Sequence, residues 1–237
     1  MDRKISEKRI LTMNLTKEEE KLIRESTIFD GFSPEELREF LKNIGAYVKL
    51  YGKGEFLFYE GDIVDQIGVI LSGEVAIVKL YPDGAEHLLQ KLKEGYMTGI
   101  EIACTEKKVS PYSTCSLSDV KILKIPYQYI EEEGTIEEKQ RLKLQNKILK
   151  FIASENIRKY YKINILSSRS LRERILLYLE VQSRKKQSLC FEIPFDRAQF
   201  ANYLCVNRSA LSKELSKMQE AGFIRYHKNK FEILRLL

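Results

Sequence analysis

The distribution of glycine is the feature that most constrains how this chain folds. Nine of the 12 glycines lie between Gly45 and Gly99, among short stretches rich in Val, Ile, Tyr and Phe. Each stretch has the length of a strand and is bounded by Gly, Asp, Pro or Ser, which favour turns. Many short strands at a spacing of about 8 to 12 residues predict an antiparallel sandwich or barrel. Within it we expect a hairpin turn at Pro82-Asp83-Gly84, because glycine supplies the positive φ that such turns need.

Helix signals lie on either side of this β region. Ser33-Pro34-Glu35-Glu36 combines an N-cap serine, a proline at the first helical position and a capping box, so it predicts the start of a short helix. Residues 135–167 contain no glycine and are dense in Lys, Glu, Gln and Leu, as expected for one long helix.

The apolar stripe of this long helix is too broad for one small barrel to cover. We expect one face to contact the barrel and the other to contact the same helix of a second subunit. Asn156 would then either fix the register of the two helices or lie in solvent. The residues expected in the dimer interface are Leu142, Leu149, Ile152, Asn156 and Ile163.

The charge of the chain is concentrated near its C-terminal end. Residues 1–169 carry equal numbers of basic and acidic side chains, whereas residues 170–237 carry 13 basic and 7 acidic ones and so hold the whole formal charge of +6. A basic segment beside a neutral one favours a polyanion such as nucleic acid as partner, and a basic solvated surface is the alternative.

The basic segment also holds the most specific motif. Asp196 predicts the start of a helix at 197–204, a three-residue turn follows at 205–207, and a second helix is expected at 208–220, which is the arrangement of a helix-turn-helix. Side chains at the start of the second helix could enter a major groove, and a basic two-stranded wing at 222–233 could contact phosphates. A plain helical hairpin is the alternative. The expected DNA-binding residues are Asn207, Arg208, Ser209, Ser212, Lys213, Lys217, Lys228 and Lys230.

The sequence carries no local signature of a metal site or of catalysis. The four cysteines form no Cys-x-x-Cys pair, and the two histidines, His87 and His227, lie far apart. We therefore expect no catalytic residues, no metal and no enzyme activity; a nucleophilic Cys104 or Cys115 is the enzymatic alternative. No apolar run approaches the roughly 18 residues of a bilayer span, and residues 1–30 lack the apolar core of a secretory signal, so a cytoplasmic protein is expected.

The order of barrel, long helix, hinge at 167–170 and winged helix-turn-helix resembles the CRP/FNR family of bacterial transcription regulators. The segments that carry the resemblance are Gly54-Glu55, Glu60-Gly61-Asp62, 70–75, Asp83-Gly84 and Gly95, together with the segment 207–215, which is similar to the family's recognition helix.

The resemblance covers about residues 29–237 and implies an α+β fold with three parts: an antiparallel β-roll or double-stranded β-helix that senses a ligand (29–134), a dimerisation helix (135–167) and a winged helix-turn-helix domain (168–237). Residues 1–28 lie outside the resemblance and are expected to form an N-terminal extension. The resemblance also implies a homodimer that binds a pseudo-palindromic site in double-stranded DNA, RNA polymerase as a further partner, and a small-molecule effector.

One departure from the family bears on that effector. Its nucleotide-binding members hold the phosphate with a Gly-Glu pair followed by an arginine and a small hydroxyl residue. Here the acid is displaced in Gly99-Ile100-Glu101, and Ser110-Pro111-Tyr112-Ser113 contains no arginine. Burying a charged phosphate without a guanidinium leaves little to offset its desolvation, so we expect no tight binding of cyclic AMP.

Iron–sulfur and haem sensing are not expected either. The first 29 residues contain no cysteine, and His87 is the only histidine of the β region. A pocket for another ligand would lie between the β-roll and the long helix, although the same groups could simply fill the core. The expected lining residues are Gly99, Glu101, Tyr112, Ser113 and Tyr160. The alternative function is a ligand-binding module that acts through a protein partner without specific DNA binding.

Overall fold

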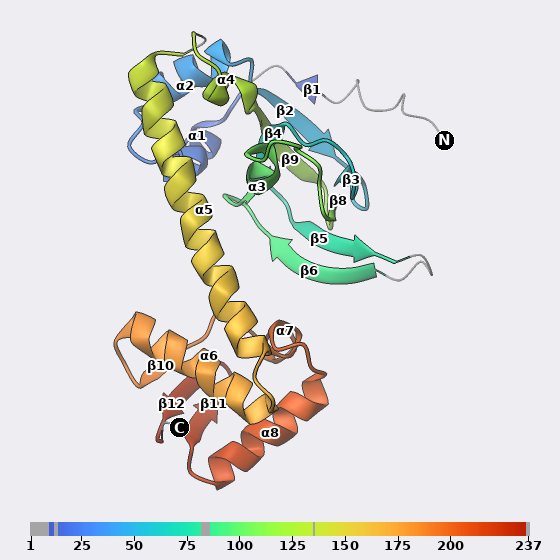
Figure 1. Ribbon diagram of the computed structural model, residues 1–237, viewed down its shortest axis with the longest axis vertical. Coiled ribbons are helices and arrows are strands. Elements are labelled where there is room, and N and C mark those ends of the chain that lie inside the picture. Colours follow the sequence, from blue (N-terminus) through green and yellow to red (C-terminus); the bar gives the residue numbers. More distant parts are fainter. Residues whose placement is uncertain (1–9, 12–13, 82–85, 135, 236–237) are drawn as a thin grey trace. The chain divides into compact units, whose positions relative to one another are not determined.

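The computed structural model describes residues 10–11, 14–81, 86–134 and 136–235, which fall into two compact units (Figure 1). The first unit comprises residues 1–153 and the second residues 154–237. None of the helices in the described ranges combines the length and apolarity that crossing a bilayer requires.

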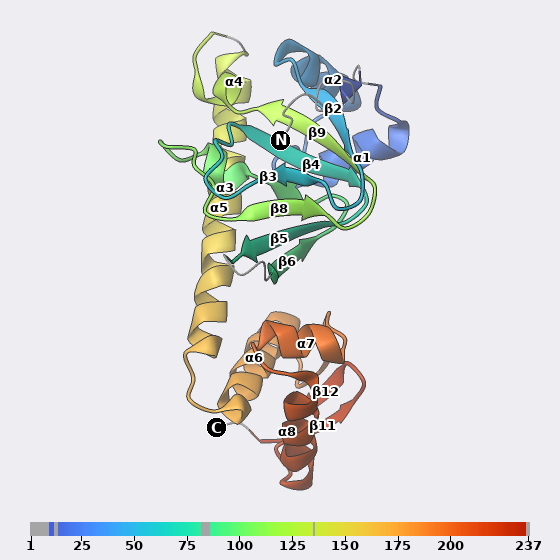
Figure 2. The same cartoon turned by 90° about the vertical axis from the view of Figure 1, so that its right-hand side faces the viewer.

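Two antiparallel sheets form the centre of the first unit. The five-stranded sheet has the order β1 (Ile10–Leu11), β2 (Tyr47–Tyr51), β9 (Val120–Pro126), β4 (Gln66–Ser72) and β7 (Met97–Thr98). The four-stranded sheet has the order β3 (Phe56–Phe58), β8 (Ser113–Ser116), β5 (Val75–Leu80) and β6 (Glu86–Leu92), and Figure 2 shows β8, β5 and β6 side by side. The predicted antiparallel β domain is thus confirmed, whereas the turn predicted at 82–84 lies outside the described residues.

The tight turn between β4 and β5 depends on Gly73. This residue has a φ of +87°, and a Cβ atom there would collide with the carbonyl oxygen of Asp119. Only glycine satisfies both requirements without moving the backbone.

The side chains on the two faces of the five-stranded sheet pack in two different hydrophobic cores. On one face, Val48, Val69 and Leu123 pack against the helices of this unit. On the other face, Ile70 and Ile122 pack against residues of the four-stranded sheet. Side chains alternate between the two faces of a strand, so β2, β4 and β9 each supply both cores.

Two short helices cover the outer face of that sheet. α1 (Lys17–Glu25) and α2 (Pro34–Asn43) both begin with a capping box, and the box predicted at Ser33 is present. Ile23 and Ile28 are fully buried, so the segment 17–28 contributes to the core of this unit and is more than an exposed extension.

The long helix predicted at 135–167 is α5 (Glu138–Leu166). Near its start, Leu144 and Ile148 are buried in the core of the first unit, together with residues of α4 (Gln128–Glu131). Leu142 and Leu149 lie on a different side of α5 and are exposed. The two apolar faces predicted for this helix therefore differ in burial within one chain.

The second unit places three helices on a small sheet. Its helices are α6 (Leu171–Lys186), α7 (Arg197–Tyr203) and α8 (Arg208–Glu220), and its sheet has the order β10 (Cys190–Glu192), β12 (Lys230–Ile233) and β11 (Ile224–His227). The helix start predicted at Asp196 is present and takes the form of a capping box, and α6 begins with another capping box at Ser170. Strands β11 and β12 form the wing that the sequence predicted.

Candidate nucleic-acid interface and ligand pocket

The helix-turn-helix is built from α7 and α8, with a short turn between them. In this turn Cys205 has a positive φ of 55°. Asn207 caps α8, because its side-chain oxygen accepts a hydrogen bond from the backbone N–H of Ala210 at 2.8 Å. The cap satisfies one of the unpaired N–H groups at the helix start and so fixes the direction of the first turn.

The two faces of α8 differ in burial. Leu211, Leu215 and Met218 are completely buried in the core of the second unit, where Phe200 and Leu204 of the preceding segment also lie. The opposite face is polar and basic, as is typical of a surface that contacts phosphates and base edges. The predicted residues on this face are exposed or half-buried: Arg208, Ser209, Ser212, Lys213 and Lys217.

These residues are not equally available to a ligand. The hydroxyl of Ser209 donates to the side-chain oxygen of Asn207 at 2.9 Å, so it supports the cap. Within the described part of the chain, neither Arg208 nor Lys213 makes a hydrogen bond or an ion pair. Their charged groups are therefore free to bond to an external anion.

The wing adds a second basic element. Lys228 occupies the turn between β11 and β12 with a φ of 54°. The ammonium of Lys230 forms an ion pair with Glu192 at 3.1 Å. Lys228 is accordingly the less constrained of the two predicted wing lysines.

Arg197 is a further basic residue that the sequence did not single out. Its guanidinium lies 4.9 Å from the centre of the Tyr226 ring and donates to the carbonyl oxygen of Lys228 at 3.4 Å. Burial, together with the nearby charge of Arg208, lowers the pKa of Arg197. This side chain links α7 to the wing turn, and only the folded arrangement reveals it.

The predicted ligand site of the first unit is largely satisfied by internal contacts. The hydroxyl of Tyr112 donates to the carboxylate of Glu101 at 2.6 Å, and burial together with this carboxylate raises the pKa of Tyr112. The hydroxyl of Ser113 accepts a hydrogen bond from the backbone N–H of Glu60 at 2.9 Å. Tyr160 belongs to the second unit, where its ring contacts that of Tyr161.

Gly99 lies at the start of α3 (Ile100–Ala103), with a φ of +78°. A Cβ atom at this position would lie only 2.9 Å from a methyl group of Val64. The segment before Glu101 is therefore held close to the β4 side of the roll.

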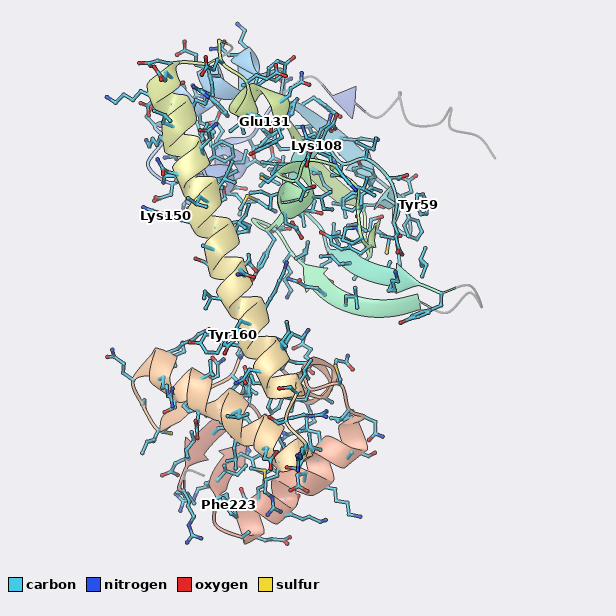
Figure 3. The ribbon with its side chains drawn as sticks, in the orientation of Figure 1. Tyr59, Lys108, Glu131, Lys150, Tyr160 and Phe223 are labelled. Carbon is cyan, nitrogen blue, oxygen red and sulfur yellow. The ribbon has the colours of Figure 1, made fainter. Side chains whose placement is uncertain are left out.

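Positive charge is scarce around Glu101. Lys108 forms an ion pair with Glu131 at 3.1 Å (Figure 3), and Lys107 is exposed. The sequence contains no arginine between Arg38 and Arg141. Residues 39–140 therefore supply no guanidinium for a phosphate, and Arg38 on α2 is already paired with Glu20 at 2.7 Å.

The structure describes all four cysteines, and none of them forms a disulfide. Burial raises the pKa of the Cys104 thiol. A raised pKa keeps a thiol protonated and unreactive near neutral pH. Among the residues that the structure describes, no group of three or more His, Cys, Asp or Glu side chains could hold a metal ion.

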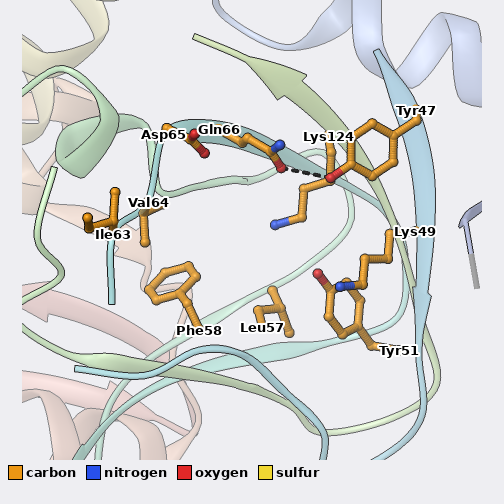
Figure 4. A pocket seen from close by; sticks show the side chains of 10 residues that line it. All are labelled: Tyr47, Lys49, Tyr51, Leu57, Phe58, Ile63, Val64, Asp65, Gln66 and Lys124. Carbon is orange, nitrogen blue, oxygen red and sulfur yellow. Dashed lines mark hydrogen bonds between the residues drawn. The ribbon is translucent and has the colours of Figure 1, made fainter. Parts of the chain in front are cut away.

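A pocket of about 130 Å³ lies elsewhere in the β-roll (Figure 4). It contains none of the predicted ligand residues, and nothing in the sequence pointed to it. Two lysines, Lys49 and Lys124, are among the ten residues that line it.

This chain matches two protein-family models and several known transcription regulators. The family model of the cyclic nucleotide-binding domain matches residues 48–133, and that of the Crp-like helix-turn-helix domain matches residues 157–236. The global nitrogen regulator of Synechococcus elongatus is 19% identical over 192 residues, which are 78% of this chain and 85% of that protein. The cyclic AMP receptor protein of Thermus thermophilus is 24% identical over 201 residues, covering 84% of this chain and 88% of that protein.

Solved structures show the same fold. The crystal structure of the Thermus thermophilus catabolite activator protein matches with a TM-score of 0.51 at 22% identity, and covers 88% of this chain and 93% of that chain.

Proposed function

Because this chain belongs to the CRP/FNR family of DNA-binding transcription regulators with an effector-binding domain, we propose that it acts as a cytoplasmic homodimer on a pseudo-palindromic site in double-stranded DNA. The observation that carries the proposal is the free basic face at the start of α8. Arg208 can bond to the O6 and N7 atoms of guanine, and Lys213 can bond to a base or a phosphate. In a dimer, two such helices about 34 Å apart would enter successive major grooves.

The exposed face of α5 supports dimerisation. Leu142, Leu149, Asn156 and Ile163 recur every seven residues, and Leu149 and Ile163 are 66% and 67% exposed. A seven-residue apolar repeat is the seam along which two helices pair. Asn156 within it would fix the register. Ile152 differs from its predicted partners, because it packs partly against the core of the first unit.

The β-roll is proposed to take an effector other than cyclic AMP. Its predicted phosphate site holds an acid, Glu101, that is already hydrogen-bonded to Tyr112, and residues 39–140 contain no arginine. A cyclic phosphate placed there would meet a carboxylate without a compensating guanidinium. The effector would act by binding unequally to two orientations of the DNA-binding domains, with RNA polymerase as the downstream partner.

The test is selection of bound duplexes from a random pool, followed by affinity measurements with variants of the full chain. Arg208→Ala should weaken binding to the selected duplex by about 1 to 3 kcal/mol and relax the base preference at one position of each half-site. Lys185→Ala is the matched control, because it removes an exposed charge of the same domain from α6. Equal effects of the two substitutions would contradict the role of α8. Failure to select any duplex would favour the alternative in which the chain acts through a protein partner.

A further inference from the structure

Lys124 is the most unusual side chain in the β-roll. It lies on β9 and is only 6% exposed, on the same face of the strand as the core residues Val120 and Ile122. No hydrogen bond or ion pair reaches its ammonium from the residues that the structure describes. An isolated buried charge is costly, and most buried lysines in proteins are therefore paired.

The ammonium of Lys124 points into the pocket shown in Figure 4. The ring of Tyr51 lies 5.8 Å from it and also lies 5.0 Å from the ammonium of Lys49. On the same side, the hydroxyl of Tyr47 donates to the side-chain oxygen of Gln66 at 3.0 Å. The only carboxylate in the pocket lining is that of Asp65, which Figure 4 places beside Val64. Lys49 also interacts electrostatically with Glu55, which lies outside the lining.

The opposite wall of the pocket is apolar. It consists of Leu57, Phe58, Ile63 and Val64. A closed cavity of about 150 Å³ holds benzene. This pocket of about 130 Å³ is open at Ile63, which is 73% exposed, so a single-ring carboxylate can fill it and extend past its rim. One end of the pocket is cationic and the other is hydrophobic, which is typical of sites that orient an amphipathic ligand.

We propose that this pocket binds a small organic carboxylate, with its carboxylate group at Lys124 and Lys49 and its hydrocarbon part against Phe58 and Leu57. Asp65 acts on Lys124 electrostatically, but among the described residues it forms no ion pair with it, so binding would place a counter-charge directly beside this buried ammonium. The pocket lining includes neither Glu101 nor Tyr112, but Phe58 and Val64 pack in one cluster with Ile102 and Tyr112.

The ligand would serve as the effector, and this second step alone rests on the proposed function. Occupancy can be measured without DNA, so failure of the site and failure of the DNA-binding proposal are distinguishable. Arg208→Ala should bind the carboxylate as the wild type does while its DNA affinity falls.

The test titrates the full chain with benzoate and, separately, with inorganic phosphate. Binding is detected from shifts in the NMR signals of the Lys124 side chain. Benzoate should give saturable shifts with a Kd of about 10 mM or tighter. Phosphate should bind at least about tenfold more weakly, because it has no hydrocarbon part to pack against the apolar wall of the pocket. For Lys124→Gln and Lys124→Met, the backbone NMR signals of β2 and β9 report binding instead. Each of these substitutions should weaken benzoate binding about tenfold or more.

Lys91→Gln is the matched control, because Lys91 is an exposed lysine on β6 of the same unit. Benzoate binding by Lys91→Gln should equal that of the wild type. No saturable shift with benzoate, tighter binding of phosphate, or unchanged binding in both Lys124 variants would each overturn the proposal.

Discussion

Replacing Lys124 with methionine should stabilise the protein at pH 7. Burial, together with the neighbouring charge of Lys49, lowers the pKa of Lys124 from 10.5 to about 8. One unit of pKa corresponds to about 1.4 kcal/mol, so holding the proton on this ammonium in the folded state costs about 3 kcal/mol. Methionine has a comparable unbranched stem and carries no charge. We expect Lys124→Met to raise the free energy of unfolding by about 1 to 3 kcal/mol at pH 7.

The sign of the pH dependence follows from the lowered pKa. Well below pH 8, Lys124 is protonated in both the folded and the unfolded chain, and the full cost is present. Between about pH 8 and 10.5 the folded chain releases this proton before the unfolded chain does, so this residue makes the wild type more stable as the pH rises. The advantage of Lys124→Met should therefore be largest near pH 7 and shrink toward pH 10.

Urea denaturation at pH 7 and pH 10 would measure this difference. Circular dichroism and tyrosine fluorescence are suitable probes, since the chain has 13 tyrosines and no tryptophan. Lys121→Met is the matched control on the same strand, because the ammonium of Lys121 pairs with the carboxylate of Glu19 at 2.6 Å. Lys121→Met should lower the free energy of unfolding by about 1 kcal/mol at pH 7, a change opposite in sign to that expected for Lys124→Met. A Lys124→Met protein that is less stable than the wild type at pH 7, or whose gain is the same at both pH values, would refute the reasoning.

Two other substitutions test the dimer and the sheet. Leu149→Glu places a charge on the seven-residue stripe of α5 and should convert the dimer to a monomer in sedimentation experiments; a dimer that persists would exclude this stripe as the interface. Gly73→Ala should cost more than about 2 kcal/mol in urea denaturation, because a positive φ and a collision with Asp119 add together. Gly45→Ala, also at positive φ but with nothing within 4 Å of the added Cβ, should cost only about 1 kcal/mol, and equal losses would show that the collision contributes nothing.

The sequence alone predicted the features that depend on neighbouring residues. The capping box at Ser33 and the cap at Asp196 each involve groups three residues apart, so their spacing is visible in the chain. The distribution of glycine likewise predicted the antiparallel β domain. The basic face of α8 could be predicted because helical periodicity separates Arg208 and Lys213 from the buried leucines.

Tertiary structure alone decided which charged and polar groups meet across distant segments. The Glu101–Tyr112 hydrogen bond joins α3 to the residue that precedes β8, and the contact of Arg197 with the wing joins residues far apart in the chain. The pocket of Lys124 requires that β9 lie between β2 and β4, a pairing fixed by long-range hydrogen bonds. A lysine in an alternating strand gives no sign of whether its face is buried, because burial depends on the opposite sheet and not on the strand itself.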